Sequence, residues 1–160
     1  MGIAAQSRAR VEDLLADLER LYDSFTVNQR TVSLPAERYE FARERYEGRS
    51  VDTYVEIENE DGEVLHVGED GDVALPGSVG RPGEALQHEV ARAVARQTGV
   101  DFSIDGLARV TIAGVSNADA TDEDVLYRLL VVFSASYEGG DPLPGAEWRA
   151  ASGAPAPTFG

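Results

Sequence analysis

Apolar residues recur at three- and four-residue spacing in two parts of the chain, and this is the period of an amphipathic helix. The first part is residues 3–25, where charged residues separate the apolar ones. The second begins near Leu86 and stops at Gly99, and the segment before it, rich in Gly and Pro from Pro76 to Gly83, is predicted to be a loop rich in turns. A glycine at that position suits a left-handed helix cap. We predict helices in both segments, and a third over residues 35–47, because Pro35 suits a first helical turn.

Other segments alternate apolar and polar residues, as half-buried strands do. The strongest strand signal is in residues 125–137, whose apolar run LLVVF is typical of a sheet interior. An Asp-Gly turn within residues 59–62 predicts a hairpin. The predicted strands are residues 26–33, 51–57, 64–67, 73–75, 107–115 and 125–137, with a last short strand at Glu147 and Trp148. Strands and helices together indicate an α/β fold.

The order of these elements divides the chain of 160 residues into three parts. Residues 1–50 form an N-terminal helical extension, residues 51–150 form an α/β domain, and residues 151–160 (ASGAPAPTFG) are predicted to be disordered. The apolar stripe of residues 3–25 requires a partner surface. That surface is either the chain's own core or a second copy in a homodimer.

The chain is strongly acidic, with a formal net charge of −15, and its 14 basic residues are all Arg. Such a surface argues against non-specific binding of nucleic acid. Acidic excess without Lys is typical of a halophilic archaeon, and a high-GC genome is the alternative source of the Arg preference. The chain has no Cys and no apolar run of membrane-spanning length, so we expect a cytoplasmic protein without disulfides or membrane contact.

Residues 77–100 and the two residues before them carry a set of residue types at defined spacings. These are Leu75, Pro76, Gly77, Glu84, Arg92, Val94, Gly99 and Val100. The set resembles the Nudix box, with Ser78 at the position of the second Gly of that motif. The resemblance implies a mixed β-sheet sandwiched by helices. It also implies a C-terminal helix after the strand at Glu147 and Trp148, where the chain shows no apolar helical pattern. Either that helix is lost, or the N-terminal helices cover the sheet face.

The resemblance further implies cleavage of a nucleoside-linked pyrophosphate with the help of Mg²⁺. The carboxylates that hold the metal in the family fall on Ala93, Arg96 and Gln97 here. Ala offers no ligand, Arg repels a cation, and Gln offers one neutral oxygen, whereas Mg²⁺ prefers carboxylates and water. We therefore predict no metal site and no cofactor, with Mg²⁺ required only if the protein is active.

The candidate site residues are a catalytic Glu84 and the ligand-binding Gly77, Arg92 and Arg96. His88, Arg92 and Arg96 stand four residues apart, which places them on one helix face. Either this face is solvated and its charges pair with Glu84 and Glu89, or Arg96 supplies the positive charge that Mg²⁺ would supply. The second interpretation predicts a catalytically degenerate protein that binds a nucleotide-like or phosphorylated ligand, or that acts as an interaction module.

The alternative is an active Nudix hydrolase with relocated carboxylates. The missing glutamates would then be replaced, as metal ligands or base, by carboxylates of Glu84, Glu89 and the acidic loop at residues 119–124. His66 lies within a predicted strand, where a packed or edge histidine is the simpler interpretation.

Overall fold

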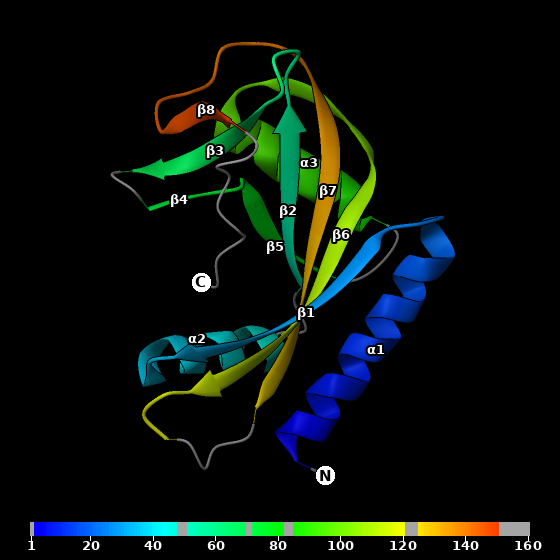
Figure 1. Cartoon of the computed structure of the whole chain (residues 1–160), viewed down its shortest axis with the longest axis vertical. Coiled ribbons are helices and arrows are strands. Elements are labelled where there is room, and N and C mark those ends of the chain that lie inside the picture. The colour runs from blue at the N-terminus through cyan, green and yellow to red at the C-terminus, as the bar shows by residue number, and fades with distance from the viewer. Residues whose placement is uncertain (1, 48–50, 70–71, 82–84, 121–124, 151–160) are drawn as a thin grey trace.

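The computed structural model describes residues 2–47, 51–69, 72–81, 85–120 and 125–150. Three helices are interspersed among eight strands along these residues (Figure 1). Their order is α1 (Ile3–Leu21), β1 (Thr26–Leu34), α2 (Ala36–Glu47), β2 (Val51–Glu58), β3 (Glu63–Glu69), β4 (Asp72–Ala74), β5 (Gly77–Gly80), α3 (Leu86–Thr98), β6 (Asp101–Asn117), β7 (Leu126–Gly139) and β8 (Ala146–Ala150). No helix among them is long and apolar enough to cross a membrane.

All the strands belong to one mixed sheet, in which β1, β6, β7, β2, β3 and β4 follow one another. β1 runs parallel to β6, and β7 runs parallel to β2, whereas β6 and β7 form a long antiparallel pair. β5 is attached to β2, and β8 to β3, both antiparallel. The predicted fold class, a mixed sheet flanked by helices, is confirmed.

The two sheet faces carry separate cores, because successive residues of a strand point to opposite sides. Leu129, Val131 and Phe133 of β7 pack with residues of α1 and α3. Leu126 and Leu130 of the same strand pack with residues of α2 instead. Helices α1 and α3 therefore share one face, and α2 covers part of the other. One of the two N-terminal helices thus covers sheet surface that α3 leaves open, which is one of the two alternatives that the sequence left open.

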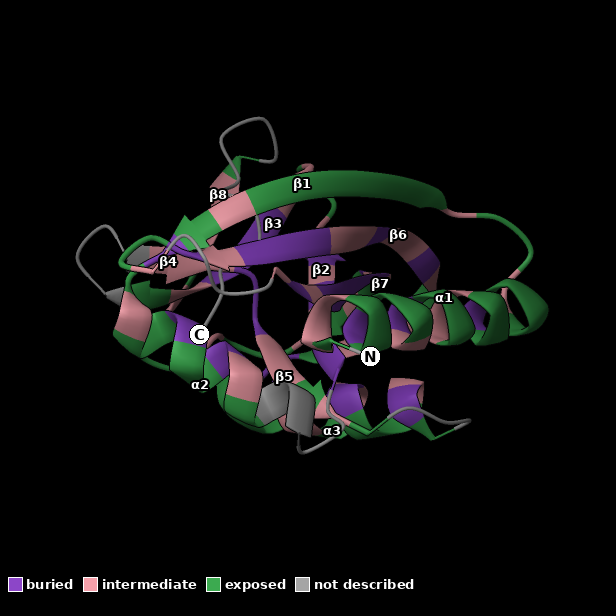
Figure 2. Ribbon diagram, turned by 90° about the horizontal axis from the view of Figure 1, so that it is seen from below, coloured by how far each residue is buried: buried purple, intermediate pink, exposed green. Residues whose placement is uncertain are grey.

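The apolar stripe of α1 packs mainly against the chain's own core. Val11 and Leu18 are buried there, and Leu14 and Leu15 pack against the same cluster. The helix ends at Leu21, four residues before the predicted end, because Tyr22 is extended (φ −129°, ψ 137°) and leads into β1. β1 then pairs with β6 along its whole length, which joins the N-terminal segment to the sheet. Figure 2 shows most of β1 exposed.

The segment at residues 77–80 differs from the sequence-based expectation. We expected a loop rich in turns, whereas it forms strand β5, paired with Val51–Tyr54 of β2. A Cβ atom on Gly77 would lie 2.3 Å from the carbonyl oxygen of Thr53 and 2.7 Å from the Tyr54 ring. Gly77 is therefore needed because two backbones approach closely here, a use of glycine that a turn pattern does not reveal.

Candidate functional site

Helix α3 is positioned by its apolar side. Leu86, Val90, Val94 and Thr98 are buried at the spacing of one helix face. Gly99 ends the helix in the left-handed conformation (φ 74°), as the sequence predicts. The Thr98 hydroxyl donates a hydrogen bond to the carbonyl oxygen of Val94 at 2.8 Å, so this polar side chain is satisfied inside the core. The opposite side of α3 is consequently fixed in place and open to solvent.

The junction between β5 and α3 is held by Gln97. Its side-chain oxygen accepts a hydrogen bond of 3.2 Å from the backbone N–H of Gly77. The Thr53 hydroxyl also donates to the carbonyl oxygen of Ser78 at 2.7 Å, which fixes β5 against β2. The N–H of Gly77, a candidate ligand-binding group, is thus already used within the protein. Gly77 and Gln97 shape the site in this structure.

This side of α3 does not fit Mg²⁺. Ala93 is partly buried and has no ligand atom, Gln97 is committed to Gly77, and Arg96 is an exposed cation. Magnesium prefers hard anionic oxygens in a nearly octahedral arrangement. Within the described ranges, no group of three or more His, Cys, Asp or Glu side chains is placed to hold a metal ion.

The cationic stripe consists of His88, Arg92 and Arg96, and all three side chains are exposed. None of them makes an ion pair with a described residue, and Glu89, although it lies on the same helix, is not a partner. Glu84, the candidate catalytic residue, lies outside the described residues. Among the described residues, the stripe therefore presents side chains without an acidic partner on a protein of net charge −15.

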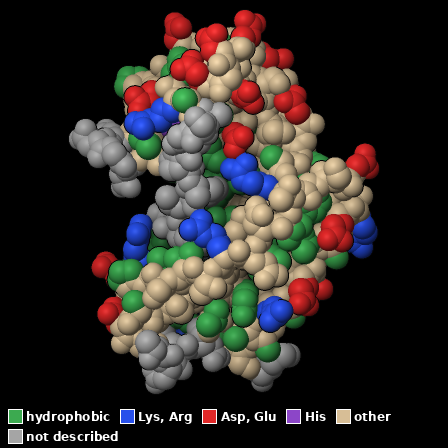
Figure 3. Space-filling model, viewed as in Figure 1, with side chains coloured by type: hydrophobic (Ala, Val, Ile, Leu, Met, Phe, Trp, Pro, Cys, Tyr) green, Lys and Arg blue, Asp and Glu red, His purple; other side chains and the backbone are tan. Residues whose placement is uncertain are grey.

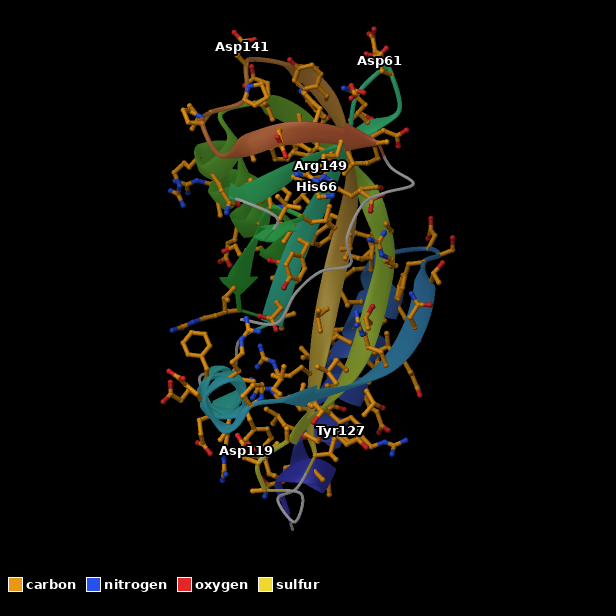
Figure 4. All side chains as sticks on the ribbon, turned by 60° about the vertical axis from the view of Figure 1, so that its left-hand side comes forward. Asp61, His66, Asp119, Tyr127, Asp141 and Arg149 are labelled. Atoms are coloured by element: carbon orange, nitrogen blue, oxygen red, sulfur yellow. The ribbon has the colours of Figure 1, made fainter. Side chains whose placement is uncertain are left out.

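Acidic side chains gather elsewhere on the surface. Figure 3 shows many of them at the end of the molecule formed by the β2–β3 turn and the β7–β8 connection. Asp61 and Asp141 lie there (Figure 4).

The acidic loop after β6 is engaged in a structural role where it is described. The Asp119 carboxylate accepts a hydrogen bond of 2.9 Å from the backbone N–H of Ala36, at the start of α2. A carboxylate is favoured there because the first N–H groups of a helix lack partners. Figure 4 shows Asp119 beside α2. Residues 121–124, also proposed as relocated carboxylates, lie outside the described residues.

A groove lies beside the cationic stripe, where the end of α1 meets α3 and β6. Its volume is about 450 Å³, and its lining residues are Leu21, Tyr22, Gln87, His88, Ala91, Phe102 and Ile104. The Tyr22 hydroxyl donates a hydrogen bond of 2.8 Å to the side-chain oxygen of Gln87. Burial raises the pKa of Tyr22 above its ordinary value of 10.0, because the phenolate loses hydration. Sequence reasoning missed this groove, since it depends on how α1 packs beside α3.

His66 is fully buried on β3. Its Nδ1 atom lies 2.9 Å from the carbonyl oxygen of Val64, and its Nε2 atom has no hydrogen-bond partner among the described residues. Figure 4 shows it next to Arg149 of the neighbouring strand β8. This burial agrees with the packed histidine expected from the sequence.

A buried ion pair was also missed. Arg128 donates to the carboxylate of Asp52 at 3.0 Å, and their side chains are only 4% and 6% exposed. Arg128 stands two residues before Leu130, the register partner of Asp52, so both side chains leave the same face of the sheet. The available signal was an Arg beside the apolar run of β7 and an acidic residue near the start of β2.

Comparisons with known proteins agree on the fold. No family model matches the chain, and no curated protein matches its sequence. The MutT protein of Bacillus halodurans is similar in structure, with a TM-score of 0.50 at 20% identity over 63% of this chain and 68% of that chain. A UDP-X diphosphatase is similar with a TM-score of 0.50 at 18% identity, over 95% of this chain and 74% of that chain. A Nudix hydrolase of Nitrosomonas europaea has a TM-score of 0.48 at 21% identity, over 64% of this chain and 73% of that chain.

At these identities the likeness concerns the fold alone. The chain has the mixed α/β fold of the Nudix hydrolases, and α3 with its capping Gly99 occupies the part of the sequence that resembles the Nudix box.

Proposed function

We propose that this protein is a Nudix-fold domain that has lost Mg²⁺-dependent hydrolysis and binds a phosphorylated, nucleotide-like molecule on α3. One observation carries the proposal. The helix face that resembles a metal-binding face instead presents a small residue at Ala93, an engaged amide at Gln97 and, at Arg96, a cation without a partner among the described residues. Such a face attracts phosphate and repels magnesium.

Arginine suits this task for two physical reasons. Its guanidinium stays protonated at any physiological pH, and its planar fork donates two parallel hydrogen bonds to phosphate oxygens. Arg92 and Arg96 stand one helical turn apart, so one phosphorylated molecule is able to contact both. The chain as a whole has a formal net charge of −15, so it supplies no competing long-range attraction for an anion.

Isothermal titration calorimetry tests the binding. We test ADP, ADP-ribose and pyrophosphate, and we expect the affinity of each molecule to be the same with and without Mg²⁺. Arg96→Gln and Arg92→Gln each weaken binding by about tenfold, since one charge-assisted hydrogen bond is lost. The matched control is Arg20→Gln, which removes an exposed Arg that is paired with Asp17 on α1. Binding that depends on Mg²⁺, or equal losses in all three variants, contradicts the proposal.

A gain-of-function variant tests the ancestry of the site. The triple change Ala93→Glu, Arg96→Glu and Gln97→Glu restores carboxylates on α3. We expect the variant to bind Mg²⁺ and to release phosphate from a panel of nucleoside diphosphate derivatives, while the parent releases none. Phosphate release by the parent would establish the alternative instead, a working hydrolase with relocated carboxylates such as Glu89.

The acidic composition leads to a separate proposal about the source, a halophilic archaeon. Self-repulsion of a −15 chain destabilises the compact state unless salt screens it. We expect the free energy of unfolding to rise from low to molar KCl. Equal stability at both concentrations would favour a high-GC genome as the reason for the Arg preference.

A further inference from the structure

Strand β1 forms one border of the sheet, and no described strand pairs with its outer edge. It pairs with β6 over all of Thr26–Leu34 without a register shift, and its first six residues are exposed (Figure 2). Strand β4, at the opposite border, has only three residues. A short border strand offers little for another chain to pair with, whereas a long and regular one is a template for a further strand.

The register of β1 shows which of its backbone groups face outward. Leu34 pairs with Asn117, and its carbonyl oxygen accepts a hydrogen bond of 2.8 Å from the N–H of Ala118. Leu34 therefore directs its backbone groups toward β6, and so does every second residue before it. The residues between them direct both their N–H and their C=O groups away from the sheet. These residues are Val27, Gln29, Thr31 and Ser33.

The side chains of β1 favour a second copy of this chain as the partner. Arg30 is the one charged residue of the strand, and none of its nine residues is Asp or Glu, although the chain has a net charge of −15. Two such acidic proteins repel each other, and the repulsion is weakest where the facing surfaces carry no acidic side chain. Thr and Val, which suit paired strands, recur along β1.

One antiparallel register suits two copies of β1 best. With Gln29 on a two-fold axis, the two Gln29 residues exchange backbone hydrogen bonds. Arg30 of each copy then stands opposite Asn28 of the other copy, whose side-chain oxygen is able to accept from the guanidinium. An axis at Arg30 instead places two guanidinium groups opposite each other, which is unfavourable. An axis at Thr31 places Arg30 opposite the apolar Val32.

We propose that this protein forms a homodimer in which β1 pairs antiparallel with β1 of a second copy, with Gln29 on the two-fold axis. The two sheets then join into one. This contact lies on a different surface from the cationic stripe of α3, so it does not depend on phosphate binding. It also leaves the apolar stripe of α1 on the chain's own core.

Cysteine crosslinking tests the dimer and its register, because the chain has no Cys of its own. In the proposed dimer the Cα atoms of the two Gln29 residues lie about 5.5 Å apart, within the range of a disulfide. The two Val27 residues are offset by about 14 Å along the strands, which is too far. We expect mild oxidation to convert Gln29→Cys into a covalent dimer and to leave Val27→Cys, the matched control, uncrosslinked. Equal crosslinking of the two variants would overturn the register.

Size-exclusion chromatography with light scattering measures the dimer without crosslinking. We expect a dimer whose dissociation constant falls from 0.15 M to molar KCl, because salt screens the repulsion between two acidic chains. Gln29→Pro removes an outward N–H and keeps the hydrogen bonds between β1 and β6, so we expect a folded monomer. Gln29→Glu places two carboxylates opposite each other and weakens the dimer by about fivefold. Val79→Glu is the matched control, because it adds a carboxylate at an exposed residue of another strand, β5.

A parent that is monomeric at every concentration and salt tested overturns the proposal. A dimer that is equally stable in the parent and in Gln29→Pro also overturns it, because the contact then lies elsewhere. If circular dichroism shows that Gln29→Pro does not fold, the comparison of Gln29→Glu with Val79→Glu decides. Equal dissociation constants for these two variants would exclude β1 as the contact.

Discussion

Two sets of arginines show how location decides what a charge does in this protein. Arg128 lies inside the sheet and is paired with Asp52 at 3.0 Å, with both side chains at least nine-tenths buried. Arg92 and Arg96 lie on the outer side of α3 and have no partner among the described residues. The same residue type is thus structural in one place and available in the other.

The physical reason is the cost of desolvation. A charge that leaves water must find an opposite charge and hydrogen bonds inside the protein, or the fold loses stability. An exposed charge keeps its hydration and contributes little to stability, so the fold does not require it. We interpret the buried pair as part of the scaffold and the exposed cations as part of the proposed ligand site.

The largest predicted effect comes from breaking the buried pair. Asp52→Ala leaves the guanidinium of Arg128 buried without its carboxylate, and we expect a loss of about 3–5 kcal/mol in the free energy of unfolding. Urea titration measures it. The double variant Asp52→Leu with Arg128→Met is the control, since replacing both charges with apolar groups is often neutral or stabilising. A loss below 1 kcal/mol for Asp52→Ala would mean that solvent reaches Arg128.

Local signals in the sequence predicted most elements of the fold. The hairpin at residues 59–62 formed because the Asn59 side chain accepts hydrogen bonds from the N–H groups of Asp61 and Glu63, and Gly62 has φ 77°. The end of α3 followed from Gly99, and the buried strand β7 followed from its apolar run. Each of these features depends on neighbouring residues, which a single sequence displays.

Features that depend on register were not predictable in the same way. Asp52 and Arg128 are 76 residues apart, and only the pairing of β2 with β7 brings them together. The strand at Gly77 looked like a loop because its glycine serves a close backbone approach to Thr53. The groove beside His88 required the packing of α1 next to α3, which an amphipathic pattern does not specify.

Gln97 is an intermediate case, since it is exposed yet has a partner. Gln97→Ala removes the acceptor for the N–H of Gly77, and we expect a loss of about 1 kcal/mol, the usual net value of a hydrogen bond. Chemical denaturation measures the loss, and hydrogen exchange at the Gly77 amide shows whether it is local. Gln97→Glu is the control, because a carboxylate accepts the same hydrogen bond. Equal losses in both variants would show that the contact to Gly77 is not the cause.

Arg92→Gln and Arg96→Gln should change the free energy of unfolding by less than about 0.5 kcal/mol, because exposed charges without partners contribute little. The measurement is urea unfolding at 0.15 M and at molar salt. Each change makes an acidic protein more acidic, so any destabilisation should shrink as salt screens the added repulsion. A salt-independent loss above 1 kcal/mol would assign these residues to the scaffold and remove the contrast with Arg128.

The smallest predicted effect concerns Tyr22, which is polar and only partly buried. Its pKa is raised above 10.0 by burial, so the folded state holds the phenolic proton more tightly than the unfolded state does. The stability that Tyr22 contributes is therefore present below pH 10.0 and is lost as the pH rises through the higher folded-state pKa. Urea unfolding from pH 8 to pH 11 should show a shallower decline for Tyr22→Phe than for the parent. The two proteins differ at this residue alone, so the difference between their declines isolates Tyr22. Parallel declines would show that its hydroxyl is as hydrated in the folded as in the unfolded state.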